Sequence, residues 1–157
     1  MAYWLVKSEP SAWSWDDQMR DGTTHWHGVR NYQAAANLKA MRLGDLAFFY
    51  HSVEERRIVG IVEVVKLYYP DPSDPKGIFG MVDVKAVRPL PRPVTLDQIK
   101  QEPKLAHLAL VRQSRLSVLP VDEASWRLIC KMGAIPQDGS HNLTRGVDNS
   151  DRIRNSE

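Results

Sequence analysis

The chain has 157 residues, of which 43% are hydrophobic and 25% are charged, as in one ordinary globular domain. Its 21 basic and 19 acidic residues give a net charge of +2, which argues against a protein that grips a long stretch of nucleic acid through many phosphates. The single cysteine, Cys130, excludes an internal disulfide, and its apolar neighbours at helical spacing predict a buried, inert thiol. The first ten residues turn polar too quickly for a signal peptide, and no apolar run is long enough to span a membrane. We therefore expect a cytoplasmic protein with no membrane partner.

The first third of the chain predicts one strand and two helices. Residues 3–7 are aromatic and β-branched, and Pro10 ends this strand because proline lacks the ladder donor. The capping-box pattern in "SWDD" predicts a helix from about 15 to 20. An irregular segment follows. The next helix begins at Asn31, is rich in alanine and ends at Gly44.

Strands dominate the rest of the chain. "DLAFFYHS" and "IVGIVEVVKLYY" predict a long hairpin around the charged turn "VEERR", and Gly60 marks a bulge or a close backbone approach. After the proline- and glycine-rich loop "YPDPSDPKGIFG", the alternating "MVDVKAVRPL" predicts another strand. A short helix capped at Thr95, a short strand in "SRLSVLPV" and an amphipathic helix ending at Gly133 follow.

The strands cluster without regular helical crossovers, which disfavours a doubly wound fold. Short helices between five or six strands indicate an α+β fold built on a curled, mostly antiparallel sheet or barrel with peripheral helices. We expect one domain over residues 1–133 and a polar extension outside the core over residues 134–157.

Few side chains suggest catalytic or metal chemistry. His25, His27 and His51 could ligate a metal, but the first two lie two residues apart in a loop without a zinc-protease motif, so we expect no metal and no cofactor. Lys7 and Glu9 alternate along one strand, as an acid–base pair or as a solvated ion pair. The sequence contains no nucleophile elbow, phosphate loop or dinucleotide fingerprint.

The segment "HWHGVRNYQ", residues 25–33, crowds aromatic and hydrogen-bonding side chains around one glycine. In this loop Trp26 lies near Arg30 and Asn31. Recognition of a single unstacked base requires such an arrangement, in which a ring stacks on the base while amide and guanidinium groups contact its edge. Trp26 therefore forms a wall of a base pocket or plugs the end of the barrel, and composition alone does not separate these interpretations.

The sequence resembles the EVE domain, a branch of the PUA-like superfamily, over about residues 2–132. The resemblance implies a PUA-like β-barrel and a pocket for one modified base: methyl- or hydroxymethylcytosine in DNA, or a modified base in RNA. It implies no catalytic activity. The blocks that carry the resemblance occur in the family's order: "YWLVKSEP", "SWDD", "W.GVRNYQA", "GDLAFFYHS", "IVGIVEVV", "YPDP", "PVTLDQIK" and "SRLSVLPV".

Matched residue by residue, the resemblance implies a base pocket in which Trp26 is the stacking plane. At two positions the chain differs from the usual family pattern: His27 replaces an acidic residue, and Ala35 replaces a frequent arginine. The implied pocket residues are Lys7, Ser8, Glu9, Trp13, Trp15, Trp26, Arg30, Asn31, His51, Ser52, Arg115 and Ser117.

The leading expectation is thus a non-catalytic binding module, monomeric by default, for DNA or RNA that carries a modified base. An enzyme is the alternative. The related ASCH branch includes members that resemble small amidohydrolases built around a lysine and a carboxylate, roles that Lys7 and Glu9 would fill.

Overall fold

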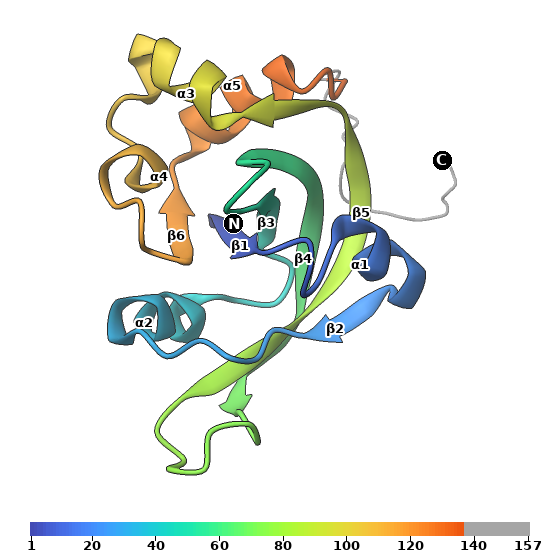
Figure 1. Cartoon of the computed structure of the whole chain (residues 1–157), viewed down its shortest axis with the longest axis vertical. Helices are drawn as coiled ribbons and strands as arrows, with labels where there is room; N and C mark the ends of the chain where they lie inside the picture. The colour runs from blue at the N-terminus through green and yellow to red at the C-terminus, as the bar shows by residue number, and fades with distance from the viewer. Residues whose placement is uncertain (137–157) are drawn as a thin grey trace.

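A strongly curled sheet of six strands is the frame of the computed structural model, which describes residues 1–136 (Figure 1). The spatial order is β2-β5-β4-β3-β1-β6. Neighbouring strands are antiparallel except for β1 and β3, which are parallel. The strands are β1 (Tyr3–Ser8), β2 (Thr23–His25), β3 (Leu46–His51), β4 (Arg57–Pro70), β5 (Gly80–Thr95) and β6 (Val118–Val121).

The α+β class and the mostly antiparallel pairing are confirmed, but the predicted barrel is not closed. Within residues 1–136 the two edge strands, β2 and β6, do not pair with each other. The long strands β4 and β5 curl around β1 and β3 (Figure 1). Register shifts in the β3–β4 and β4–β5 pairings bend the sheet. The sheet is therefore curled and open.

Short helices cover the outside of the curl. In Figure 1, α3, α4 and α5 gather near β6, whereas α1 and α2 adjoin the segment around β2. None of the described helices is long and apolar enough to cross a membrane. The helices are α1 (Trp15–Asp21), α2 (Tyr32–Ala40), α3 (Leu96–Gln101), α4 (Ala109–Arg112) and α5 (Glu123–Met132), with a 3-10 turn η1 (Pro103–Leu105).

Local capping signals placed the helix starts correctly. Ser14 and Thr95 each form a full capping box, and Asn31 accepts the backbone N–H of Ala34 at 2.9 Å. Helix α2 ends before the predicted Gly44, because Met41 already has extended backbone angles. Three further elements, β2, η1 and α4, were not predicted from the sequence.

The core fills the space between the curled sheet and the helices around it, and helix α5 contributes its largest side chain, Trp126. Phe48 and Trp126 stack with ring centroids 3.8 Å apart. Burial raises the pKa of Cys130 to about 12, as expected for an inert thiol. Ile135 is also buried in this core. The core therefore continues past residue 133, where the polar extension was predicted to begin. Residues 137–157 of that extension lie outside the described residues.

Candidate nucleic-acid interface

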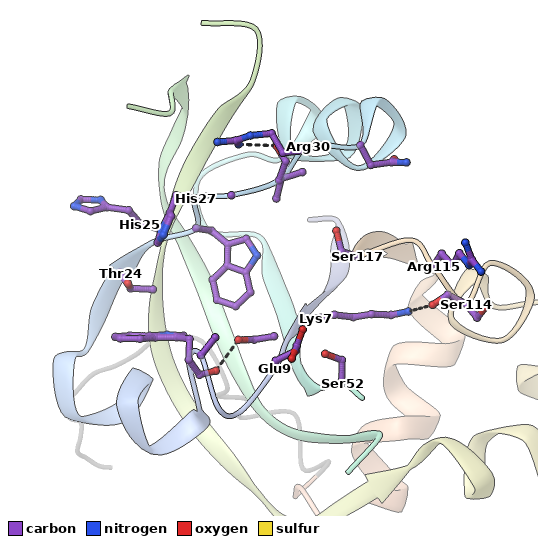
Figure 2. Close-up of a pocket in the computed structure, with 17 residues that line it drawn as sticks. Lys7, Glu9, Thr24, His25, His27, Arg30, Ser52, Ser114, Arg115 and Ser117 are labelled. Atoms are coloured by element: carbon purple, nitrogen blue, oxygen red, sulfur yellow. Dashed lines mark hydrogen bonds between the residues drawn. The ribbon is translucent and has the colours of Figure 1, made fainter. Parts of the chain in front are cut away.

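A cavity of about 610 Å³ opens where the end of β1, the segment after β2 and the segment before β6 meet (Figure 2). We call it the main cavity. In Figure 2 the side chains of Thr24 and His25 lie on one side of it, and Ser114 and Arg115 lie on the opposite side. The following residues line it: Lys7, Ser8, Glu9, Ala12, Trp13, Thr24, His25, Trp26, His27, Gly28, Val29, Arg30, Asn31, Ser52, Ser114, Arg115 and Ser117.

The structure brings most of the predicted pocket residues together around this cavity. They come from widely separated parts of the chain, and the pairing of β1 with β6 together with the curl of the sheet makes them neighbours. The predicted residues that line the cavity are Lys7, Ser8, Glu9, Trp13, Trp26, Arg30, Asn31, Ser52, Arg115 and Ser117. Contact with a base stays a prediction for each of them.

Trp15 and His51 do not line the main cavity, so their assignment to its wall was wrong. Trp15 is 6% exposed, and its ring packs edge-on against Phe49 with centroids 5.3 Å apart. His51 is 7% exposed, and its Nε2 accepts the backbone N–H of Trp15 at 3.0 Å. Its proton therefore lies on Nδ1, which donates to Glu55 at 2.8 Å. Both side chains are committed to the packing of α1 against β3.

Trp26 belongs both to the core and to the cavity wall. It is 8% exposed, and its ring stands nearly perpendicular to that of Phe49, with centroids 5.5 Å apart. Its backbone N–H donates to the carbonyl of Val82 at 2.8 Å, which anchors the segment after β2 to strand β5. Any base that stacks on Trp26 therefore meets a ring fixed from behind, at little cost in side-chain entropy.

Trp13 is held rigidly at the cavity edge. Its indole N–H donates to the Oε1 of the buried Gln18 at 2.9 Å, and its carbonyl accepts the hydroxyl of Ser8 at 2.6 Å. Gln18 in turn donates to the carbonyl of Gly22 at 2.9 Å. The first turn of α1 thus fixes the orientation of an aromatic ring that lines the cavity.

Asp71, which was not among the residues predicted from the sequence, holds the segment 26–31 in place from the loop between β4 and β5. Its buried carboxylate accepts the backbone N–H of Gly28 at 2.8 Å and the guanidinium of Arg30 at 3.1 Å, and it also accepts both the N–H and the hydroxyl of Ser73. Burial alone would raise its pKa, but these hydrogen bonds, from Ser73, Gly28 and Arg30, hold the pKa of Asp71 well below its usual range. We call this arrangement the Asp71 clamp.

The Asp71 clamp changes the role expected of Arg30. Its guanidinium donates to Asp71 and to the hydroxyl of Ser73 at 3.0 Å, so it is engaged by the protein rather than directed into the cavity (Figure 2). The aspartate and serine of "YPDPSDP", two residues apart, are a turn signal that could have identified the clamp in the sequence. Ala35, where the family often has arginine, is buried in α2 and does not line the cavity.

The EVE domain family matches this chain over residues 2–132. The chain belongs to the EVE domain family. Thymocyte nuclear protein 1 of Rattus norvegicus is 37% identical, and the match covers 83% of this chain and 73% of the relative.

Solved structures agree with this assignment. The NMR structure of Rpa0253 from Rhodopseudomonas palustris is 53% identical with a TM-score of 0.83, and the match covers 90% of this chain and 99% of that one. The crystal structure of human THYN1 protein in complex with 5-methylcytosine containing DNA is 32% identical with a TM-score of 0.79. It covers 85% of this chain and 98% of the human chain.

Lys7 is the most buried cation of the main cavity in this EVE domain. Its Nζ donates to the backbone carbonyl of Ser114 at 2.8 Å, and burial lowers the pKa of Lys7 (Figure 2). Within residues 1–136 no ion pair joins Lys7 to Glu9, which is exposed just beyond the end of β1. An ammonium group has three donors, so Lys7 has donors left for the acceptor edge of a ligand.

His25 and His51 contact protein carboxylates, whereas His27 Nδ1 lies 3.2 Å from the backbone carbonyl of His25. His25 Nδ1 lies 2.9 Å from Asp83 Oδ1, which also accepts the hydroxyl of Tyr69. Burial and the contact with Asp83 raise the pKa of Tyr69 to about 12. Burial alone would raise the pKa of Asp83, but the hydrogen bonds from Tyr69 and His25 lower it. Among residues 1–136 no group of three or more histidine, cysteine, aspartate and glutamate side chains could hold a metal ion.

Proposed function

We propose that this EVE domain binds DNA that carries a modified cytosine and holds that base, turned out of the double helix, in the main cavity without transforming it. The observation that carries the proposal is the cavity itself, which places two fixed tryptophan rings beside uncommitted donors in one concave site. The human THYN1 complex with 5-methylcytosine containing DNA supports the choice of ligand.

The chemistry of the cavity suits cytosine. At about 610 Å³ it falls within the range of small-ligand sites, so it offers room for a base and its sugar. The ammonium group of Lys7 can donate to the acceptors of the base edge, and the carboxylate of Glu9 can accept an exocyclic amino group. The fixed ring of Trp26 can pack against a methyl group or against the base face.

The expected discrimination between bases is modest. Burial of one methyl group gains about 0.8 kcal/mol, a factor of about four in affinity. A hydrogen bond to a hydroxymethyl oxygen adds roughly 0.5 to 1.5 kcal/mol. We therefore expect a preference over cytosine of about fourfold for methylcytosine and of about tenfold to fiftyfold for hydroxymethylcytosine. Binding should be tighter where the base is mismatched and easier to extrude.

Fluorescence-anisotropy titration with short oligonucleotides tests the proposal. Each would carry one central cytosine, methylcytosine or hydroxymethylcytosine, as single- or double-stranded DNA and as the RNA equivalent. We expect wild type to prefer the modified DNA, and Trp26→Ala to lose that preference because the cavity wall is gone. Because Trp26 also packs in the core, a second variant, Ser52→Phe, narrows the cavity from a partly exposed position without removing core contacts.

The two variants separate a folding defect from a binding defect, with thermal unfolding as the folding control. Loss of preference in folded Ser52→Phe supports the cavity as the site. Equal binding of all oligonucleotides by wild type and by both variants contradicts it. If the RNA oligonucleotides bind more tightly than the DNA oligonucleotides of the same sequence, the ligand is RNA and not DNA. Turnover of acylated cytidines that disappears in Lys7→Ala would instead support an ASCH-like hydrolase.

A further inference from the structure

A second, smaller cavity of about 280 Å³ adjoins the main cavity. Asn31, Ser114 and Arg115 line both cavities. One bound molecule can therefore extend from the main cavity into the smaller one. Gln33, Gln113 and Leu116 complete the lining of the smaller cavity, which we call the side groove. It lies between the start of α2 and the segment before β6.

The side groove offers uncommitted polar groups. Gln33, Gln113 and Arg115 are exposed, and within residues 1–136 their side chains form no hydrogen bond or ion pair. The Oδ1 of Asn31 caps α2 by accepting the N–H of Ala34, which leaves the amide NH2 of Asn31 for a ligand. The groove thus offers three amide side chains and one guanidinium group close to a site that we assign to a base.

This set of side chains fits the backbone of a nucleic acid better than a second base. Amide, hydroxyl and guanidinium groups are the usual partners of phosphate and sugar oxygens. A second base would call for an aromatic platform, and none of the residues that line the groove is aromatic. One groove-sized contact also agrees with a chain whose net charge is only +2.

We propose that the side groove binds the sugar and phosphate of the nucleotide next to the base in the main cavity, with Arg115 on the phosphate that joins the two. The inference rests on the proposed function, because it takes the main cavity as the base site. The side groove then adds binding affinity and fixes the position of the strand along the protein. Base identity is then distinguished in the main cavity alone.

Two probes separate the groove from the main cavity: the nucleoside 5-methyl-2′-deoxycytidine, which has no phosphate, and a DNA trinucleotide with a central methylcytosine. The variant Gln33→Ala/Gln113→Ala changes side chains that line only the side groove. By NMR titration we expect this variant to bind the nucleoside as wild type does and the trinucleotide about tenfold more weakly. Gln101→Ala, an exposed position at the end of α3 that lines neither cavity, is the matched control and should change neither affinity.

Salt dependence gives a second readout. Arg115→Gln should reduce the slope of log affinity against log salt concentration for the trinucleotide by about 0.7, the value for one phosphate of a single strand. The inference would be overturned if Gln33→Ala/Gln113→Ala bound the trinucleotide as tightly as wild type does, or lost the same affinity for the nucleoside as for the trinucleotide. A methyl preference in wild type would then still support the proposed function. If wild type binds neither 5-methyl-2′-deoxycytidine nor the methylated trinucleotide more tightly than the same probe with unmodified cytosine, the proposed function fails, and the groove assignment fails with it.

Discussion

Replacement of Trp15 by alanine is expected to lower the free energy of unfolding by about 3 to 5 kcal/mol. The ring is 6% exposed, packs against Phe49 and covers Gly60, so its removal leaves a cavity between α1 and the sheet that the surrounding backbone cannot fill. Urea denaturation measures the change. A loss below 1 kcal/mol would mean that the ring is not part of the core.

The contact between Trp15 and Gly60 can be isolated with a double-mutant cycle. A Cβ on Gly60 would lie 2.5 Å from the Trp15 ring, so Gly60→Ala alone should destabilise the protein by about 1 to 3 kcal/mol through overpacking. In a Trp15→Leu background the added methyl group has more space, and the loss should shrink. Simple additivity of the two changes would show that no steric contact joins these positions.

Replacement of Asp71 by alanine is expected to lower the free energy of unfolding by about 2 to 4 kcal/mol and to weaken binding in the main cavity. The change leaves the N–H of Gly28 and the guanidinium of Arg30 without their buried acceptor, so the segment that carries Trp26 loses its anchor to the loop between β4 and β5. Asp74→Ala is the matched control. Asp74 caps backbone N–H groups of the same loop but has no hydrogen bond to the segment 26–31 within the described part of the chain.

The Asp71 clamp also predicts a pH dependence of stability. The folded-state pKa of Asp71 lies below the value of about 3.9 that an aspartate has in the unfolded chain. Its contribution is therefore fully present above about pH 4 and is lost as the pH falls through that value toward the lower folded pKa. The difference in unfolding free energy between wild type and Asp71→Asn should be constant from pH 5 to 7 and should shrink below pH 4. A difference that grew on acidification would contradict the clamp.

Structural features that depend on residues close together in the chain were predicted correctly from the sequence. The capping boxes at Ser14 and Thr95 join groups three residues apart, and the amphipathic pattern before Gly133 is a property of one helix. Gly60 was expected at a bulge or a close approach, and the structure has a register shift beside it and the Trp15 ring over it. These features depend on hydrogen bonds and periodicities that the local sequence contains.

Side-chain direction was the weaker part of the prediction. The sequence correctly suggested that Trp26 and Trp13 lie near one cavity, but it gave Trp15 and His51 the same role, although both face the core. A tryptophan can line a cavity or fill a core with similar local sequence around it. Which of these occurs depends on the partner surface, here Phe49 and Gly60.

By itself, then, the sequence determined the class of fold, most of the helices and strands, the family resemblance and most of the residues that line the main cavity. Only the tertiary structure decided how the cavity is held together. The Asp71 clamp joins residues 43 positions apart, and the hydrogen bond from Lys7 to Ser114 spans 107 positions. Such contacts exist because β1 lies between β3 and β6, and because β2 adds to the edge of β5. The order of strands in a sheet is a property of the whole chain, and no local pattern encodes it.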